Sequence, residues 1–493
     1  MVTIERLRKY VNENAETCAV AIILALALMF RMMLLGLHCL HMDECLYANY
    51  AIRMLRHGDL TLNGGLVVDK PPFFFYFIAL SFLINGISEN AARLPNMIFS
   101  LVTVYYLYKF AKAAYPESRF TPVLSAFFLA FSSYYTVFSV TAFQDISMTA
   151  FLVMSLYYLK KDRFFLSPFL YFLSITCKPM TLFIFPVYLA FYLLQAGFKI
   201  DSAKLKQAGL AGLYVFGPLV LWSAFLANPR WGIFRFFETQ QPGVLSVTAD
   251  FGSRFMDWLG QSAHIVNGYM WLALAAIGPL IFVMIRLIKG RVKETAHELL
   301  PFFAAAYIYV FLSLMKFRVF DRYLIVAVPF LALGLGRLFS LVEESGLFKK
   351  PAVKAVLLAA VCFAYMLPMR GLDKSGMNMG ALFTASDGFD RVAKYIKARG
   401  VENIDLVYYG NSIGWYGYFY LADEKFYRVS GAHTAEQLAR IETPKGKSLL
   451  VVVNARDREK SEVEALKAAY RTVYTSGEED GRGEKFFFDG EDK

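Results

Sequence analysis

The stretch AVAIILALALMFRMMLLGL (residues 19–37) is followed, after three intervening residues, by HMDECLY (residues 41–47). The first segment carries a single charge and is long enough to cross a bilayer as a helix. The second places two carboxylates, Asp43 and Glu44, directly at the membrane edge. Charges at that depth are costly, so they are retained mainly where they function. The two segments together predict a membrane helix that leads into a functional loop.

The composition indicates a membrane protein with one soluble part. The chain has 493 residues, of which 57% are hydrophobic, and its mean hydropathy is +0.43. Apolar runs recur from residue 19 to about residue 369, whereas the residues that follow are charged and turn-rich. We therefore predict a polytopic α-helical membrane domain of about 11–13 transmembrane helices over residues 1–370. A small extracytoplasmic α/β domain is expected over residues 371–493.

The net charge of +11, with a pI of about 9.2, does not indicate nucleic-acid binding. The cations are spread along the chain at the ends of apolar runs, which is how membrane proteins distribute Lys and Arg. Residues 1–18 are polar and the first apolar run is long, so we expect no cleavable signal peptide. We therefore expect the protein to contact membrane lipid and not to bind nucleic acid.

The positions of Lys and Arg orient the predicted spans. Inner loops collect these residues, so Arg6, Arg8 and Lys9 place the N-terminus inside. The resulting parity puts outer loops at residues 38–94 and 228–263, and it puts the C-terminal domain outside. The eleven expected spans are residues 19–37, 95–111, 120–138, a run ending near 160, 164–177, 179–197, 207–227, a run ending near 286, 299–315, 323–341 and 352–369.

Residues 71–84 are apolar but short for a span, so we expect them to remain on the outer surface. A span there would move every later loop to the other side. Several cations fall outside against the general rule, and a site for a lipid phosphate would explain several of them at once. They are Lys70, Lys178, Arg235, Arg254, Lys316, Arg318 and Arg322.

Six short motifs follow one another on the predicted outer face. They are Asp43-Glu44-x-x-Tyr47, Asp69-Lys70-Pro71-Pro72, Arg93-Leu94-Pro95, Asp145, Thr176-Cys177-Lys178-Pro179, and Arg322-Tyr323 with Pro329. As an ordered set they resemble the GT-C membrane glycosyltransferases, over roughly residues 19–340. The resemblance is to the branch that contains the lipid A aminoarabinose transferases (ArnT) and the protein O-mannosyltransferases.

This resemblance implies an outer-leaflet polyprenyl-phosphate sugar donor, pentosyl or hexosyl, and transfer to an acceptor hydroxyl or phosphate with inversion. It implies that Asp43 is the essential acid of the first outer loop and that Asp145 is the second acid. Lys70 matches the family's Lys-Pro-Pro segment, and Asp69 stands where the family commonly has Glu. We see no luminal repeat modules of the eukaryotic protein mannosyltransferases, which disfavours a protein acceptor. Lipid A, another glycan and a protein nevertheless all stay open.

The same chemistry can be argued from the residues. Transfer of a sugar to a hydroxyl needs a base, and a partly desolvated carboxylate is a better base. A phosphate leaving group gains negative charge, which cations stabilise, and a second carboxylate could stabilise an oxocarbenium-like transition state. The candidate catalytic residues are Asp43, Glu44 and Asp145. The candidate substrate-binding residues are Tyr47, Asp69, Lys70, Lys178, Lys316, Arg322 and Tyr323.

Each candidate also has a structural interpretation. Asp43 and Asp145 could each be the N-cap of a helix. Lys70 could be an interfacial lysine with its ammonium in the headgroups. Lys178 could be solvated in an outer hairpin, and Arg322 with Tyr323 could form an interfacial anchor.

A divalent cation held by Asp43 and Asp145 is an open option, because carboxylate oxygens suit hard ions. His38 and His41 are weak metal-ligand candidates. Arg31 lies inside the first predicted span and is expected to pair with an acid or to reach the membrane surface, with substrate contact as the less favoured role. The five cysteines form no metal pattern, so we expect free thiols; they are Cys18, Cys39, Cys45, Cys177 and Cys362.

The last part of the chain reads as α/β. Expected helices near residues 388–400, 434–441 and 458–470 alternate with expected strands at residues 404–409, 449–453 and 471–475. This alternation favours a partly parallel sheet. Such a domain could position the acceptor, cap the membrane site or be purely structural.

The leading hypothesis is a monomeric multi-pass enzyme of a bacterial cytoplasmic (inner) membrane, with its active site outside. The runner-up is a lipid or solute transporter. Transporters place charges near the bilayer midplane and use internal repeats, whereas here the charges gather at the outer edge. A third alternative, an inactive scaffold, predicts that Asp43 and Asp145 can be changed to Asn without loss.

Overall fold

In this computed structural model most of the chain is described. The described residues are 14–37, 39–62, 71–195, 202–221, 246–262, 265–275, 292–316, 321–344, 350–371, 389–410, 414–426, 428–442, 445, 447–454, 460–469, 472–475 and 486–489. The predicted spans near 222–227 and 276–286 and the outer loop at 228–245 lie outside these residues.

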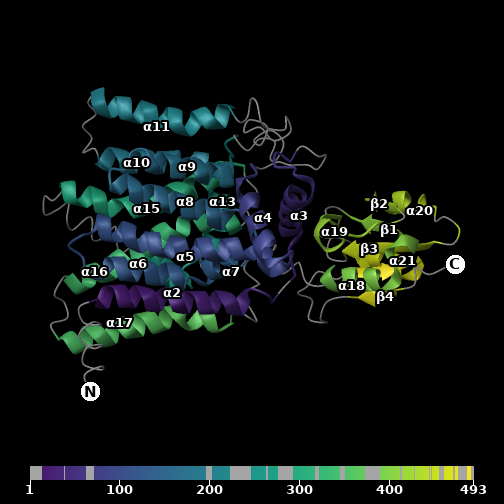
Figure 1. Cartoon of the computed structure of the whole chain (residues 1–493). Coiled ribbons are helices and arrows are strands. Elements are labelled where there is room, and N and C mark those ends of the chain that lie inside the picture. Colours follow the sequence, from purple (N-terminus) through teal and green to yellow (C-terminus); the bar gives the residue numbers. More distant parts are fainter. Residues whose placement is uncertain are drawn as a thin grey trace, which may run out of the picture.

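The molecule is a helical bundle with a small C-terminal sheet and its helices at one end (Figure 1). That this part is a separate domain stays a prediction. The bundle helices are α2 (Ala15–Leu34), α5 (Glu89–Ala114), α6 (Thr121–Ala130), α7 (Ser133–Ser139), α8 (Asp145–Lys160), α9 (Leu166–Cys177), α10 (Phe185–Gln195), α11 (Ser202–Leu221), α13 (Phe251–Ser262), α15 (Val292–Leu314), α16 (Val328–Glu344) and α17 (Pro351–Met366). Short 3₁₀ helices, η1 (Pro179–Ile184), η3 (Asp321–Ala327) and η4 (Leu367–Gly371), adjoin α10, α16 and α17.

By length and hydropathy, three helical stretches of the described chain can each cross a membrane: Ala15–Leu34, Asp321–Leu341 and Ala352–Met369. The pair α6 and α7, which is bent by 60°, passes the same test together and is either a broken span or a re-entrant loop. Several remaining apolar helices are shorter. The predicted number of spans therefore stays a prediction.

The bend between α6 and α7 corrects the continuous helix expected over residues 120–138. The side chain of Ser132 accepts a hydrogen bond from the backbone N–H of Tyr135 and so caps α7. Asn267 Nδ2 donates to the carbonyl of Phe131 at 2.8 Å. These polar side chains satisfy backbone groups that the break releases, which is what allows a bend inside an apolar bundle.

Two close contacts hold the bundle helices at fixed positions. Arg31 of α2 is buried and donates to Ser100 Oγ of α5 at 2.8 Å and to the carbonyl of Ala130 at 3.2 Å. It therefore joins three helices through neutral acceptors and not through the acid expected from sequence. Gly336 of α16 lies against α6, where a Cβ atom would be 2.6 Å from the backbone nitrogen of Ser125. Only glycine fits this contact, which fixes α16 and the η3 segment that precedes it.

The segment predicted as the first outer loop contains two short helices, α3 (Met42–His57) and α4 (Phe73–Asn85). Both lie at the end of the bundle that faces the sheet domain (Figure 1). With 13 residues, α4 falls among the shorter apolar helices. The expectation that residues 71–84 stay at the outer surface stays a prediction.

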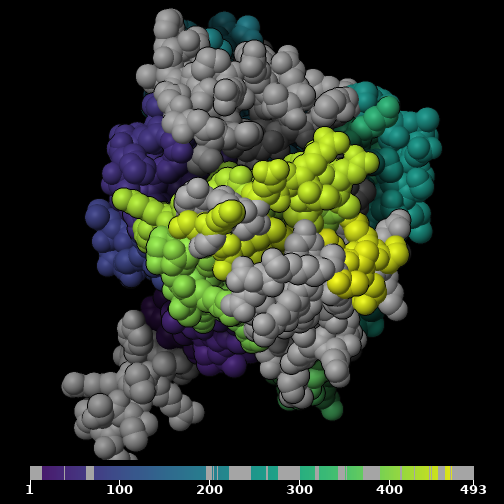
Figure 2. Space-filling model, turned by 90° about the vertical axis from the view of Figure 1, so that its right-hand side faces the viewer, coloured from purple at the N-terminus to yellow at the C-terminus, as the bar shows by residue number. Residues whose placement is uncertain are grey.

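The C-terminal sheet has the order β2-β1-β3-β5-β4, in which β1 is parallel to β2 and β3, and β5 is antiparallel to β3 and β4. The elements are α18 (Phe389–Arg399), η6 (Val401–Asn403), β1 (Ile404–Tyr409), α19 (Gly414–Tyr420), β2 (Arg428–Ala432), α20 (Ala435–Ala439), β3 (Ser448–Asn454), α21 (Lys460–Ala469), β4 (Thr472–Thr475) and β5 (Phe486–Asp489). The predicted partly parallel sheet is present, with β1, β3 and β4 where they were expected. Sequence patterns missed α19, β2 and β5. Figure 2 views the molecule from this end and shows the green and yellow C-terminal residues across the middle of the face.

Candidate active site

The N-terminus of α3 carries the first candidate acid. His41 is the N-cap, because its Nδ1 accepts a hydrogen bond from the backbone N–H of Asp43 at 3.1 Å. Glu44 closes a capping box by accepting from the backbone N–H of His41 at 2.8 Å. Asp43 is therefore not the N-cap considered from sequence. It lies in the first turn, where the helix dipole favours its negative charge.

Glu44 is the centre of a buried network. Arg93 of α5 donates to both of its carboxylate oxygens at 3.1 Å, and the backbone N–H of Ala142 donates at 2.7 Å. Arg93 also donates to the carbonyl of Cys39 at 2.9 Å. Burial would raise the pKa of Glu44, but Arg93 and the N–H groups of His41 and Ala142 hold that pKa below its ordinary value. Glu44 thus ties the first outer loop to the segment that leads to the second acid.

The N-terminus of α8 carries that second acid, Asp145, which forms a buried ion pair with Lys178. Gln144 occupies the N-cap position, so the N-cap interpretation of Asp145 was wrong. Lys178 lies between α9 and η1, where extended backbone (φ −150°, ψ 117°) interrupts the helix. Its ammonium also lies 4.5 Å from the ring centroid of Tyr323, in a cation–π geometry.

The start of η3 brings the two acids together. Arg322 donates from Nη1 to Asp43 Oδ2 at 2.9 Å, and its guanidinium lies 4.7 Å from the ring centroid of Phe143. The ring of the next residue, Tyr323, lies against Lys178, which pairs with Asp145. Two adjacent residues of η3 thus contact both carboxylate–cation pairs. Five of the predicted site residues, from segments far apart in sequence, meet at this point: Asp43, Asp145, Lys178, Arg322 and Tyr323.

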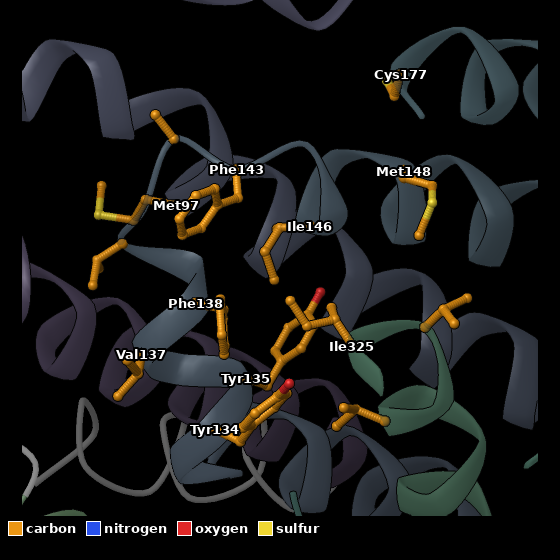
Figure 3. Close-up of a cluster of buried hydrophobic side chains, with 14 of the residues drawn as sticks. Met97, Tyr134, Tyr135, Val137, Phe138, Phe143, Ile146, Met148, Cys177 and Ile325 are labelled. Atoms are coloured by element: carbon orange, nitrogen blue, oxygen red, sulfur yellow. The ribbon is translucent and has the colours of Figure 1, made fainter. Parts of the chain in front are cut away.

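A cluster of buried apolar side chains includes Phe143, which lies against Arg322. Figure 3 shows Phe138 and Phe143 in one cluster with Ile146 of α8 and Ile325 of η3, and each of these side chains is buried. Charges next to such a cluster interact more strongly than they would in water. The arrangement therefore gives a low-dielectric site that holds two acids and two cations.

A third carboxylate, Asp321, was missed from sequence. Its Oδ1 accepts from the backbone N–H of Arg322 at 2.7 Å, and its side chain is buried. Oδ2 is also buried and has no hydrogen-bond partner within the described part of the chain. Asp321 directly precedes Arg322, at the predicted outer end of a span. A carboxylate at that place was the signal that could have identified it.

The remaining predicted residues have different positions. Tyr47 is buried, with its ring 5.4 Å from that of Phe75 and 6.4 Å from that of Tyr50. Lys316 is exposed and forms no ion pair with any residue the structure describes, so it does not join this group. Asp69, Lys70 and His38 lie outside the described residues, and their predicted roles stay predictions.

No third His, Cys, Asp or Glu completes a metal-binding group within the described ranges. Asp43 and Asp145 each have a cation already in contact, and a divalent ion would compete with Arg322 and Lys178 for them. Metal binding by these two acids stays a prediction. All five cysteines lie in the described residues, and no disulfide joins any two of them.

The whole chain is similar to solved structures of known enzymes. The chain is similar to the ArnT of Cupriavidus metallidurans in its apo state, with a TM-score of 0.64, 15% identity, and coverage of 97% of this chain and 98% of that one. The same enzyme bound to undecaprenyl phosphate gives a TM-score of 0.60 at 15% identity, covering 96% and 97%. The chain has the GT-C glycosyltransferase fold. The resemblance inferred from the motifs is confirmed, and the apolar helices of this fold make the chain a multi-pass membrane protein.

Other GT-C proteins extend the comparison. The Archaeoglobus fulgidus oligosaccharyltransferase, tethered to an acceptor peptide, has a TM-score of 0.61 at 11% identity and covers 98% of this chain and 75% of that one. That enzyme has also been crystallised with Zn and sulfate, with a TM-score of 0.56 at 12% identity, covering 83% and 62%.

Sequence comparison reaches a smaller part of the chain. The family described as dolichyl-phosphate-mannose-protein mannosyltransferase matches residues 69–222. An uncharacterized protein of Aquifex aeolicus (strain VF5) is 24% identical over 204 residues, and this match spans 39% of each chain.

Proposed function

We propose that this protein is an inverting glycosyltransferase that moves a sugar from a polyprenyl phosphate to an acceptor hydroxyl or phosphate at the outer face of the membrane. The observation that carries the proposal is the meeting of Asp43–Arg322 and Asp145–Lys178 at η3, in a chain with the GT-C fold. The undecaprenyl phosphate bound by the related ArnT supports a lipid-linked donor. The finer assignments, to the outer face of a bacterial inner membrane and to lipid A or another glycan as acceptor, belong to the same proposal.

The reaction requires a base and a site for the leaving group. Because the configuration inverts, the acceptor and the leaving group lie on opposite faces of the sugar. The acceptor oxygen attacks the anomeric carbon, and its proton passes to Asp43, which is the more accessible of the two aspartates. The bond between the anomeric carbon and the phosphate oxygen breaks, and its electron pair stays on the polyprenyl phosphate. Lys178 and Arg322 stabilise the charge that develops there.

Asp145 and Asp321 act on the sugar itself in this proposal. Asp145 lies beside Lys178 and stabilises positive charge on the ring as the bond to phosphate breaks. Asp321, whose buried Oδ2 has no hydrogen-bond partner in the described ranges, accepts from a substrate hydroxyl. Glu44 is a positioning residue, because Arg93, His41 and Ala142 already occupy its oxygens.

The test compares cells that carry the wild type or Asp43→Asn at equal expression. Mass spectrometry of the lipid extract should show a polyprenyl-phosphate sugar that accumulates only with the variant, together with loss of one glycosylated product. The mass of the accumulated lipid would identify the sugar. Identical lipids and products in the two strains would instead favour the transporter or scaffold hypothesis. Treatment of wild-type membranes with EDTA would separately decide whether a divalent ion is required.

A further inference from the structure

The C-terminal domain contacts the first outer loop through α19 and the turn after it. Asn49 of α3 donates from Nδ2 to the carbonyl of Tyr418 at 2.6 Å. Arg56, one residue from the end of α3, forms an ion pair with Asp423. The rings of Phe82 and Phe419 lie 6.5 Å apart. The domain therefore contacts α3 at more than one point along its length.

The hydroxyl of Tyr420 lies where three segments meet. It accepts a hydrogen bond from the backbone N–H of Leu40 at 2.7 Å and donates to Glu89 Oε1 of α5 at 2.6 Å. Burial raises the pKa of Tyr420, so the hydroxyl stays protonated and can serve as donor and acceptor together. One atom of the C-terminal domain thereby links the bundle to the segment just before α3.

That segment determines where Asp43 lies. Arg93 binds the carbonyl of Cys39, Glu44 binds the N–H of His41, and His41 Nδ1 binds the N–H of Asp43. These three contacts come from the bundle and from α3 itself. The contact to the N–H of Leu40 comes from the C-terminal domain. A change there alters the start of the helix that carries the proposed base.

We propose that Tyr420 is a positioning residue through which the C-terminal domain holds Asp43 in place opposite Arg322. The inference rests on the proposed function and assigns the domain a role in it. Displacement of a catalytic group by about 1 Å can reduce a rate by roughly 100-fold, so a hydroxyl remote from the reacting atoms can have a large effect.

The test uses the full-length protein in detergent and compares Tyr420→Phe with Tyr418→Phe. Tyr418 is the matched control, because it is exposed and contributes its backbone carbonyl to the contact with α3. Hydrogen exchange of the peptide covering residues 39–47 is measured first, since it needs no substrate. It should become faster in Tyr420→Phe only, with thermal midpoints of the two variants alike.

The second measurement is transfer, with the lipid extract of Asp43→Asn cells as donor and membranes of those cells as acceptor. We expect Tyr420→Phe to lower kcat by about 10-fold to 100-fold, with KM for the donor within about twofold of the wild type. If Tyr420→Phe does not fold, the pair Arg56→Gln with Asp423→Asn loosens the same contact from the surface and should change exchange and kcat in the same direction.

Unchanged exchange in Tyr420→Phe, or faster exchange with an unchanged kcat, would overturn the positioning role. A change in KM alone would also overturn it, because a misplaced base affects the chemical step. If the wild type itself gives no transfer, the proposed function fails, and the exchange comparison still decides whether Tyr420 fixes the segment before α3.

Discussion

The N-termini of α3 and α8 each place an aspartate in the first helical turn, but in different surroundings. The side chain of Asp43 is 17% exposed and its partner Arg322 is 12% exposed. Asp145 and Lys178 are only 3% and 7% exposed. A helix start favours negative charge at both positions, so the helices alone do not explain the difference.

The difference comes from what holds each helix. At α3 the buried pair of Glu44 and Arg93 fixes the backbone, and Asp43 can face the site with one oxygen on Arg322. At α8 the charged pair itself is buried between packed segments. Two aspartates in the first turn of a helix thus have different surroundings. In the proposed reaction, the more accessible one accepts the proton of the acceptor and the buried one supplies fixed charge.

The largest expected effect separates these tasks. Asp43→Asn should lower transfer by about 10²-fold to 10⁴-fold, the range for loss of a general base, and leave the thermal midpoint close to that of the wild type. Asp145→Asn should also impair transfer, but it leaves Lys178 buried without its anion and should destabilise the fold by about 3–5 kcal/mol. Transfer assays and thermal unfolding of the two purified variants test the contrast. Equal loss of stability in both would show that accessibility does not distinguish the two sites.

The next prediction concerns the neighbouring acids of α3. Glu44→Gln should destabilise the protein by about 3–5 kcal/mol, because Arg93 is left as a buried, uncompensated charge. Glu44→Leu and Arg93→Met should each lower the free energy of unfolding. The double variant should lose less than the sum of these two losses, since both charges are removed together. Unfolding measured in a double-mutant cycle tests this. Strict additivity of the two substitutions would contradict a direct ion pair.

Part of this architecture could be predicted from sequence because it depends on local patterns. Apolar runs with flanking cations identified the membrane bundle, and alternating helix and strand patterns identified β1 and β3 of the sheet. Asp43, Asp145, Lys178 and Arg322 were noticed because a charge at a membrane edge is costly and therefore informative. Their pairing, Asp43 with Arg322 and Asp145 with Lys178, was not predictable, because it joins segments as much as 279 residues apart.

Other features have no local signal at all. Glu44 next to Asp43 looks like a second catalytic acid, and only the packing of α5 shows that Arg93 binds it. Lys316 and Lys178 look alike in sequence, as outer-face lysines near apolar runs. The interrupted helix between α9 and η1 buries Lys178, while Lys316 follows α15 and stays exposed. Burial of this kind depends on tertiary packing, so the spacing of residues in the sequence does not predict it.

These two lysines give the third prediction. Lys178→Gln keeps a hydrogen-bond donor but removes the charge, and it should lower transfer by about 10²-fold if the ammonium stabilises the leaving phosphate. Lys316→Gln should change transfer by less than about twofold, as expected for an exposed side chain away from the site. Both rates are measured with the same donor extract. A comparable loss in Lys316→Gln would restore that residue to the substrate-binding group.

The smallest expected effect is the pH dependence of folding stability that comes from His41, which caps the N-terminus of α3. Burial lowers the pKa of His41 below its ordinary value of about 6.5, against the attraction of Asp43 and Glu44 and together with repulsion from Arg322 and Arg93. The unfolded chain therefore binds the proton more tightly than the folded one. Stability is complete above about pH 6.5 and falls as the pH decreases toward the lowered pKa.

His41→Asn isolates this contribution, because asparagine also caps a helix but does not titrate. The thermal midpoint of the wild type should decrease between pH 7 and pH 5.5, and that of His41→Asn should change less over the same window. Glu44 acts at lower pH, since its pKa lies below the ordinary value; its contribution is present above about pH 4.3 and is lost as the pH falls through the lowered pKa. Glu44 therefore contributes little to a change between pH 7 and pH 5.5. A midpoint that falls equally in both proteins above pH 5.5 would exclude His41 as the titrating group and direct attention to another buried pair.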